Sequence, residues 1–211
     1  MTIVADRSPA GQAPAQTSPA QGSKALSAMI DGQLRTSGVN AEWILRRMSD
    51  VPRENFVPEG ARGYAYIDRA IDLGDGRSLA APVVHGMMLQ EAAPAAGDSA
   101  IVVEGGSGYL AELLRPLVGS LQAIDPAAAL AATRGKGTAT LLVIDGAIEQ
   151  LPDSLVSRLA EGGRVVTGLS RDGITSLAIG RKVGGEVALL PLLELGIPIL
   201  PEFAAPRRWS F

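Results

Sequence analysis

The stretch VVEGGSGYLAELL, residues 102–114, carries the strongest indication of the fold of this chain. Apolar, β-prone residues run into Glu104, a glycine-rich loop follows, and an apolar helical pattern begins at Tyr109. A glycine loop between a strand and a helix lets the backbone approach a ligand closely, and it leaves free N–H groups at the start of the helix. Such a backbone can hold a dinucleotide or an S-adenosyl cofactor.

Strands and helices are expected to alternate after residue 98. The expected elements are strands at 99–104, 121–125, 138–145 and 164–169, helices at 109–118, 126–134 and 151–163, and a final hairpin at 174–193 that turns at 183–185. This alternation predicts a parallel sheet covered on both faces, with an antiparallel pair at its end. Ligands of such sheets bind at the carboxyl ends of the strands, so the glycine loop, Asp125 and Asp145 are expected on one rim.

The chain begins with a stretch rich in Ala, Pro, Gln, Ser and Gly, and we expect residues 1–24 to be a disordered tail. The tail has no apolar run of the kind found in secretory signals. Two helical patterns follow it, on either side of a turn at 37–40, and Asn40 is the expected N-cap of the second. A further short helix is expected at 83–91.

Composition narrows the classes of function. The chain has 211 residues, a length that suits one domain plus a tail. Its net charge is −3 and it has no basic stripe, which argues against nucleic acid as a main partner. It has no cysteine, which excludes disulfides and thiol chemistry, and a single histidine, which argues against a histidine metal site or a Ser-His-Asp triad. We therefore expect no metal and a cytoplasmic protein. The apolar run at 187–200 is broken by Pro191, Glu194 and Pro198, so no membrane helix is expected.

Residues 50–82, DVPRENFVPEGARGYAYIDRAIDLGDGRSLAAP, resemble the substrate segment of the protein-L-isoaspartate O-methyltransferase family. That family shows a VPRExFVP motif, a Y-x-D motif and a G-Q-T-I-S-x-P motif. VVEGGSGY resembles the first S-adenosylmethionine motif of the family, and residues 155–169 resemble a later segment. The resemblance covers residues 28–193, and VPRENFVP is its most specific part.

The resemblance implies an α/β, Rossmann-like class I S-adenosylmethionine-dependent methyltransferase fold. It implies methylation of the α-carboxyl of isoaspartyl residues, so the expected partners are isoaspartyl proteins or peptides. Methyl transfer from a sulfonium to a carboxylate mostly requires alignment of two reactants. The expected division is a helical and substrate-segment region at 25–96, the methyltransferase core at 97–195 and a C-terminal extension at 196–211.

The resemblance also implies the site residues. The cofactor loop would consist of Glu104, Gly105, Gly106, Ser107 and Gly108. Asp125 resembles the acid that accepts hydrogen bonds from the ribose hydroxyls, although an N-cap before a helix starting with proline is an equally good reading. In the family's third motif Ser78 keeps a catalytic hydroxyl, whereas Ala80 replaces the serine beside the reacting carboxylate.

Three departures from the family pattern bear on activity. Glu104 and Gly108 lie four positions apart, where the family motif has six. Only residues 126–137 separate Asp125 from the next expected strand, so the family's third strand is expected to be missing, which leaves about six strands with 121–125 at the sheet edge. Loss of the serine replaced by Ala80 removes a positioned donor, a change that costs about 10²–10³ in rate elsewhere.

These departures leave two hypotheses. The first is a family member with weak or lost activity, a pseudoenzyme that serves as a binding or assembly module. The second is a working methyltransferase whose shortened loop still holds S-adenosylmethionine. A nicotinamide-dependent enzyme is disfavoured because G-x-G-x-x-G is absent.

Several other residues have both a functional and a structural reading. His85 is expected either to line a cleft or to pair with nearby backbone. Arg53 and Glu54 would either contact substrate or organise a loop, and Tyr64, Tyr66 and Asp68 would either cover the site or only pack. Met87, Met88 and Leu89 are expected in the core. The edge strand at 121–125, or the C-terminal segment with Phe203, Arg207, Arg208, Trp209 and Phe211, is a candidate contact for a second copy or a protein partner.

Overall fold

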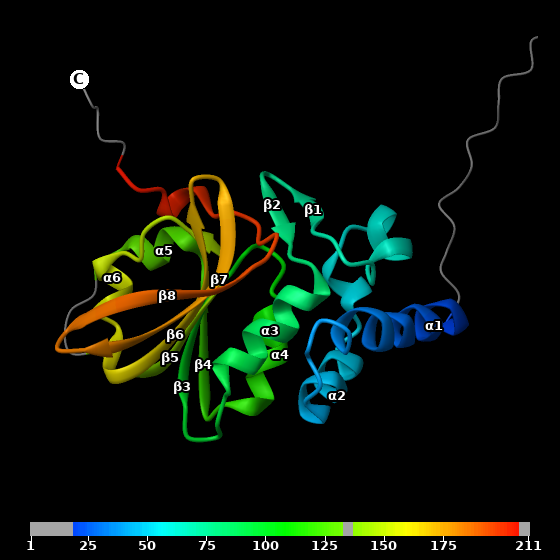
Figure 1. Ribbon diagram of the computed structural model, residues 1–211, viewed down its shortest axis with the longest axis horizontal. Helices are drawn as coiled ribbons and strands as arrows, with labels where there is room; N and C mark the ends of the chain where they lie inside the picture. The colour runs from blue at the N-terminus through cyan, green and yellow to red at the C-terminus, as the bar shows by residue number, and fades with distance from the viewer. Residues whose placement is uncertain (1–18, 133–136, 207–211) are drawn as a thin grey trace, which may run out of the picture.

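The computed structural model describes residues 19–132 and 137–206. Its centre is a six-stranded sheet in the order β4-β3-β5-β6-β7-β8 (Figure 1). The strands are β3 (Ser99–Val103), β4 (Ser120–Ile124), β5 (Ala139–Ile148), β6 (Leu159–Arg171), β7 (Ile174–Val183) and β8 (Glu186–Glu194). The first four run parallel and the last two add antiparallel pairs. The six strands, the edge position of β4 and the final hairpin confirm the expected architecture.

Side-chain alternation along the central strands builds a core on each face of the sheet. Ala100 and Val102 of β3 belong to one cluster of buried side chains, and Ile101 and Val103 belong to the other. The first cluster is closed by α3 (Pro82–Ala92) and α4 (Tyr109–Leu114), which continues as η4 (Arg115–Leu117). The second is closed by α5 (Pro126–Leu130), α6 (Asp153–Val156) and the C-terminal turn η5 (Pro201–Phe203). The period of two in a strand thus sends alternate side chains into separate layers.

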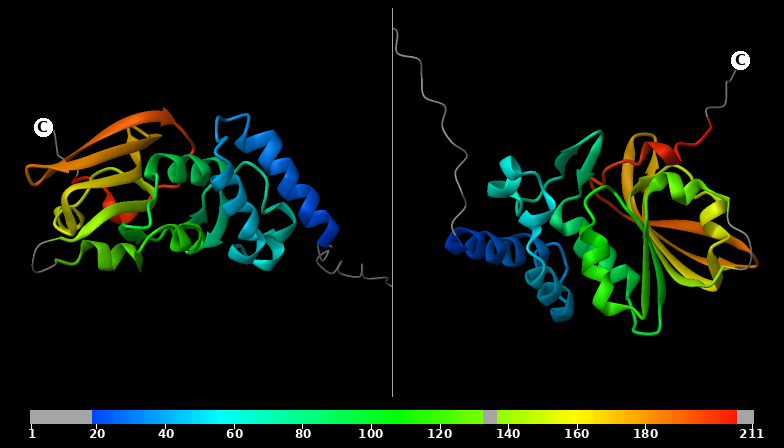
Figure 2. Two further views of the ribbon diagram at one scale, coloured as in Figure 1. Left: turned by 90° about the horizontal axis from the view of Figure 1, so that it is seen from below. Right: turned by 180° about the vertical axis from the view of Figure 1, so that it is seen from behind.

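The N-terminal helices lie beside the sheet, next to α3, as both views in Figure 2 show. They are α1 (Pro19–Met29), the π-helical turn η1 (Ile30–Leu34) and α2 (Glu42–Asp50), followed by η2 (Arg53–Phe56) and η3 (Glu59–Tyr64). A small hairpin of β1 (Ile71–Gly74) and β2 (Arg77–Leu79) leads into α3. Met87, Met88 and Leu89 of α3 are buried, as expected.

Three local expectations are wrong. Helix α1 begins at Pro19, so the last residues of the expected tail are helical, while residues 1–18 lie outside the described part. Asn40 is not the N-cap of α2, because that helix begins at Glu42 after Ala41 and has no side-chain cap. The helix expected at 151–163 ends at Val156, since Leu159 pairs with Ala139 and starts a strand instead.

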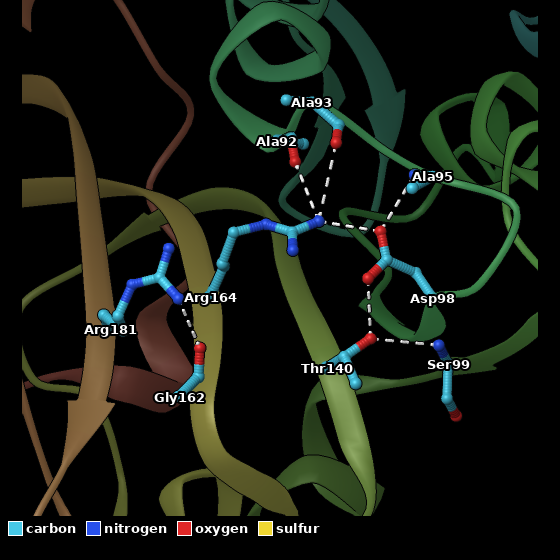
Figure 3. A network of polar contacts seen from close by, with 9 residues as sticks. All are labelled: Ala92, Ala93, Ala95, Asp98, Ser99, Thr140, Gly162, Arg164 and Arg181. Atoms are coloured by element: carbon cyan, nitrogen blue, oxygen red, sulfur yellow. Dashed lines mark hydrogen bonds and ion pairs between the residues drawn. The ribbon is translucent and has the colours of Figure 1, made fainter.

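A polar network holds the amino ends of the strands to the end of α3 (Figure 3). Asp98 accepts hydrogen bonds from the Thr140 hydroxyl at 2.7 Å and from the backbone N–H of Ala95 at 2.9 Å. Arg164 of β6 lies 2.7 Å from the same carboxylate and also donates to the carbonyl of Ala92. The carboxylate therefore joins β5, β6 and the loop before β3.

The segment after β8 packs along the carboxyl end of β5. Ile199 forms a parallel bridge with Ala147, and Leu200 and Phe203 are buried in the second core cluster. The Phe203 carbonyl accepts hydrogen bonds from the backbone N–H groups of Glu149 and Gln150, each at 3.2 Å. The C-terminal extension is thus part of the folded unit as far as Ala205, whose backbone N–H donates to the Glu149 carboxylate. Arg207, Arg208, Trp209 and Phe211, which the sequence offered as a partner contact, lie outside the described residues.

Candidate functional site

The three expected rim positions meet at the carboxyl ends of the parallel strands. Glu104 follows β3, Asp125 follows β4, and Asp145 lies within β5 at an irregularity in its pairing with β6. Bulges of this kind redirect side chains and are common beside functional sites. The sequence therefore located the rim correctly, although it did not indicate which way each carboxylate points.

The glycine loop has the backbone conformation that its sequence requires. Gly106 has φ of +113° and Gly108, the N-cap of α4, has φ of +74°. Residues that carry a Cβ rarely adopt such values. Ser107 accepts a hydrogen bond from the backbone N–H of Tyr109 at 3.1 Å and closes the turn. The short loop is thus a well-formed connection between β3 and α4.

Two neighbours fill the space beside the loop glycines. A side chain at Gly105 would collide with the backbone carbonyl of Asp145. At Gly106 an added Cβ would lie 2.9 Å from Cβ and 3.0 Å from Cγ of Arg77. The stem of Arg77, from the β1–β2 hairpin, therefore occupies the place that the missing side chain of Gly106 leaves open.

The guanidinium of Arg77 is held by Glu202 of the C-terminal turn η5. Both terminal nitrogens of Arg77 donate to the Glu202 carboxylate, one of them at 3.2 Å. Desolvation opposes ionisation of Glu202, but the hydrogen bonds and charge of Arg77 outweigh it and keep the pKa of Glu202 below its usual value. The pair is about three-quarters buried, with side-chain exposures of 25% and 27%. It ties the substrate-segment hairpin to the C-terminal segment across the loop.

Glu104 is directed into the protein. Burial, and secondarily the negative charge of Asp145, raises the pKa of Glu104 to about 7, although the backbone N–H of Gly108 stabilises its charged form. One of its oxygens, Oε2, is buried and has no hydrogen-bond partner. Two carboxyl groups are thus close enough for the charge on one to disfavour ionisation of the other.

His85 connects Asp145 to Arg53 in the centre of the molecule. Nε2 of His85 lies 2.9 Å from Oδ1 of Asp145, and Nδ1 lies 3.2 Å from a terminal nitrogen of Arg53. A guanidinium can only donate, so Nδ1 accepts and Nε2 carries the proton that is donated to Asp145. All three side chains are buried. The expectation that His85 pairs with nearby backbone is wrong, because its partners are side chains from distant segments.

Arg53 organises the substrate segment. Its guanidinium donates to the carbonyls of Ala65, at 2.7 Å, and of Ala80, and it lies 5.2 Å from the ring centre of Tyr109. Desolvation lowers the pKa of Arg53, and electrostatic interaction with the Tyr109 hydroxyl and the Asp145 carboxylate opposes that effect. Of the two roles considered for Arg53, these contacts are those of a residue that organises a loop.

The remaining substrate-segment residues are held by local contacts. Glu54 accepts a hydrogen bond from the hydroxyl of Tyr66, which is buried, whereas Tyr64 is exposed and lies beneath Arg69. Ser78 lies half-buried in β2 opposite Asp72, and Ala80 is buried. Asp68 is exposed.

Asp125 caps helix α5. Its Oδ1 accepts a hydrogen bond from the backbone N–H of Ala128 at 2.7 Å, and Pro126 occupies the first helical position. Asp125 thus acts as a helix cap, and this role engages one of its two carboxylate oxygens.

Among the described residues no group of three or more histidine or acidic side chains is arranged to hold a metal ion. No helix in the same residues is long and apolar enough to cross a membrane.

The sheet, its glycine loop and its terminal antiparallel hairpin define a Rossmann-like class I S-adenosylmethionine-dependent methyltransferase fold. The chain is similar to the crystal structure of a protein-L-isoaspartate O-methyltransferase from Plasmodium falciparum in complex with S-adenosyl-L-homocysteine, with a TM-score of 0.66 and 18% identity over 84% of this chain and 98% of that one.

Sequence comparison gives the family. The family model described as protein-L-isoaspartate(D-aspartate) O-methyltransferase matches residues 24–133. A protein-L-isoaspartate O-methyltransferase of Aeropyrum pernix is 33% identical over 208 residues, which cover 84% of this chain and 80% of the relative. Protein-L-isoaspartate O-methyltransferase 2 of an Anaeromyxobacter species is 30% identical over 175 residues and 72% of each chain. The chain therefore belongs to the protein-L-isoaspartate O-methyltransferase family.

The stem of Arg77 covers the Cβ side of Gly106, whereas a Cβ added at Gly108 would meet no atom within 4 Å. Glu104 lies close enough to Asp145 for that carboxylate to raise its pKa, and within the described residues β4 is the edge strand of the sheet.

Proposed function

We propose that this chain is a protein-L-isoaspartate O-methyltransferase family member with weak or absent methyl transfer, which acts as a binding module on the methyltransferase fold. The observation that carries the proposal is the position of Arg77. Its stem lies against Gly106, and its guanidinium is bound by Glu202, so a side chain of the chain itself fills the space beside Gly106 that the proposal assigns to the cofactor.

Three further features support the proposal. Asp125 already engages one oxygen as a helix cap, and Ala80 is a buried methyl group at the position where the resemblance places a serine. Within residues 19–132 and 137–206, strand β4 forms the edge of the sheet and has no outer neighbour to carry a loop for the adenine. Each change by itself is tolerable, but together they affect the cofactor and the acceptor carboxylate at once.

The test is calorimetric titration of S-adenosyl-L-homocysteine into the full chain. We expect no heat and no thermal stabilisation at millimolar ligand, and no methyl incorporation into an isoaspartyl peptide from radiolabelled S-adenosylmethionine. Micromolar binding together with methyl transfer would overturn the proposal. Binding without transfer would retain the binding-module part of it and move the defect from the loop to Ala80.

The second candidate function is methyl transfer to isoaspartyl carboxyls by a shortened but working loop. It is favoured by the left-handed conformations of Gly106 and Gly108, which keep the loop in a form only glycine adopts readily. In that case Ser78, Glu104 to Gly108 and Asp125 would keep the roles that the resemblance implies. Isoaspartyl proteins or peptides would be the partners under this second function.

The location of the chain is part of the same proposal. We place it in the cytoplasm, where a protein without a single cysteine needs no oxidative folding. We also keep the division into a substrate-segment region at 25–96, a core at 97–195 and a C-terminal extension at 196–211. The exposed edge of β4 is the candidate contact for a second copy.

A further inference from the structure

The contact between Arg77 and Glu202 joins two segments far apart in the chain beside Gly106 of the glycine loop. Arg77 belongs to the β1–β2 hairpin and Glu202 to the turn that follows the sheet. Both nitrogens of the guanidinium fork meet the carboxylate, the arrangement in which arginine binds a carboxylate with the greatest directional specificity. The guanidinium position therefore fixes the stem of Arg77 above Gly106.

The carboxylate that holds Arg77 is presented by a rigid segment. Pro198 accepts a backbone hydrogen bond from Ala147 at 2.7 Å, and Leu200 donates one back to Ala147 at 2.9 Å. Leu200 also packs onto Gly146, where an added Cβ would lie 2.5 Å from its Cγ. Phe203 is 2% exposed. Glu202 is thus held between two anchored residues and is not a freely rotating surface side chain.

We propose that the C-terminal segment is an autoinhibitory strap, in which Glu202 acts as an internal carboxylate ligand that holds Arg77 across the glycine loop. The inference rests on the proposed function, because it assigns the absence of cofactor binding to this contact. Release of Glu202 frees the guanidinium, and the stem of Arg77 can then leave Gly106. An acidic peptide that competes for the guanidinium would have the same effect as removal of Glu202.

The experiment compares the full-length chain with three variants, using S-adenosyl-L-homocysteine as the probe and calorimetry as the readout. Arg77→Ala removes the stem from Gly106, and Glu202→Gln removes the charge that fixes it. Glu149→Gln is the matched control, because the Glu149 carboxylate also binds the C-terminal segment, through the backbone N–H of Ala205 at 2.8 Å, but does not contact Arg77. Thermal unfolding of each variant tests whether the fold is retained.

We expect Arg77→Ala and Glu202→Gln to bind the probe at least tenfold more tightly than the unchanged chain, and Glu149→Gln to bind like the unchanged chain. If no variant binds, the strap inference fails while the proposed function stands. If the unchanged chain binds as tightly as Arg77→Ala, the strap inference fails, and the proposed function fails with it if methyl transfer accompanies the binding. If Glu149→Gln gains affinity as Glu202→Gln does, general loosening of the segment is responsible and the assignment to Arg77 is wrong.

Discussion

Nε2 of His85 donates a hydrogen bond of 2.9 Å to Oδ1 of Asp145, and both side chains are buried. The other nitrogen of the imidazole faces Arg53, so Asp145 is linked through one ring to the buried guanidinium. The hydrogen-bond partners of Arg53 include two carbonyls and the imidazole, which carry no formal charge, and Asp145 is the carboxylate that acts on it through charge. Asp145 therefore supplies the compensating negative charge for the interior of the substrate segment.

Asp145→Asn should destabilise the protein strongly. The substitution keeps the shape and a hydrogen-bond acceptor for His85 but leaves Arg53 without a nearby negative charge at that position. Loss of a hydrogen bond to a charged group costs about 1.5–3 kcal/mol of unfolding free energy, and the uncompensated charge of Arg53 acts in the same direction. Urea denaturation at neutral pH measures it, and Asp172→Asn, in an exposed turn, is the control that should stay within about 0.5 kcal/mol. Equal midpoints for the two variants would contradict the role given to Asp145.

Glu104 should make the protein less stable as the pH rises. Burial and the charge of Asp145 raise its pKa to about 7 from an ordinary 4.5, so the folded state binds the proton more tightly than the unfolded state. The stabilisation is fully present below the unfolded pKa and is lost as the pH rises through the folded pKa. Glu104→Gln keeps the group neutral, so the variant should match the wild type near about pH 4 and exceed it near about pH 8.

The measurement is the difference in unfolding free energy between wild type and Glu104→Gln as a function of pH. The difference is required because Asp98 and Glu202, whose pKa values are lowered, change stability in the opposite direction. Glu59→Gln, at an exposed position, is the control and should give a flat difference. A flat profile for Glu104→Gln as well would show that its carboxyl is solvated.

The architecture could be predicted because it follows from local patterns. The short spacing after Asp125 predicted the missing strand, and β4 lies at the sheet edge as expected. The glycines of the loop predicted a tight connection from β3 to α4. The sequence predicts too long a helix at 151–163, because its apolar pattern also suits a strand. In the structure Leu159 pairs with Ala139, so the second half of this segment belongs to the sheet.

The contacts around the loop could not be predicted, because they join segments distant in sequence. His85 and Asp145 are separated by 60 positions, and Arg77 and Glu202 by 125. No periodicity or motif connects such pairs, and each side chain on its own has an ordinary structural explanation. The one available signal was a lone histidine within a strongly apolar helix, since a buried imidazole requires a polar partner.

Asp98→Asn should destabilise the protein at neutral pH and much less in acid. Burial alone raises the pKa of Asp98, but hydrogen bonds from Thr140, Ala95 and Arg164 outweigh it and hold the pKa below its ordinary value of 3.8. The stabilisation is present above the unfolded pKa and is lost as the pH falls through the folded pKa. Loss of a hydrogen bond to a charged group costs about 1.5–3 kcal/mol.

Denaturation of Asp98→Asn across the acid range tests this, with the exposed Asp68→Asn as control. The gap between wild type and Asp98→Asn should close toward low pH, while the control should show no gap at any pH. A gap that persists at low pH would mean that Asp98 contributes through packing and not through its charge.

Gly105→Ala should be among the most harmful small substitutions in the loop. An added methyl group would collide with the backbone carbonyl of Asp145, and backbone cannot move aside as a flexible side chain can. Overpacking of this kind costs about 1–3 kcal/mol and sometimes more. Gly97→Ala is the matched control, because no atom lies within 4 Å of the added Cβ and the φ angle of Gly97 is not positive. We expect this variant to be more stable by about 0.4–1 kcal/mol. The two variants should thus move the unfolding midpoint in opposite directions, and a stable Gly105→Ala would mean that the loop and β5 lie farther apart in solution.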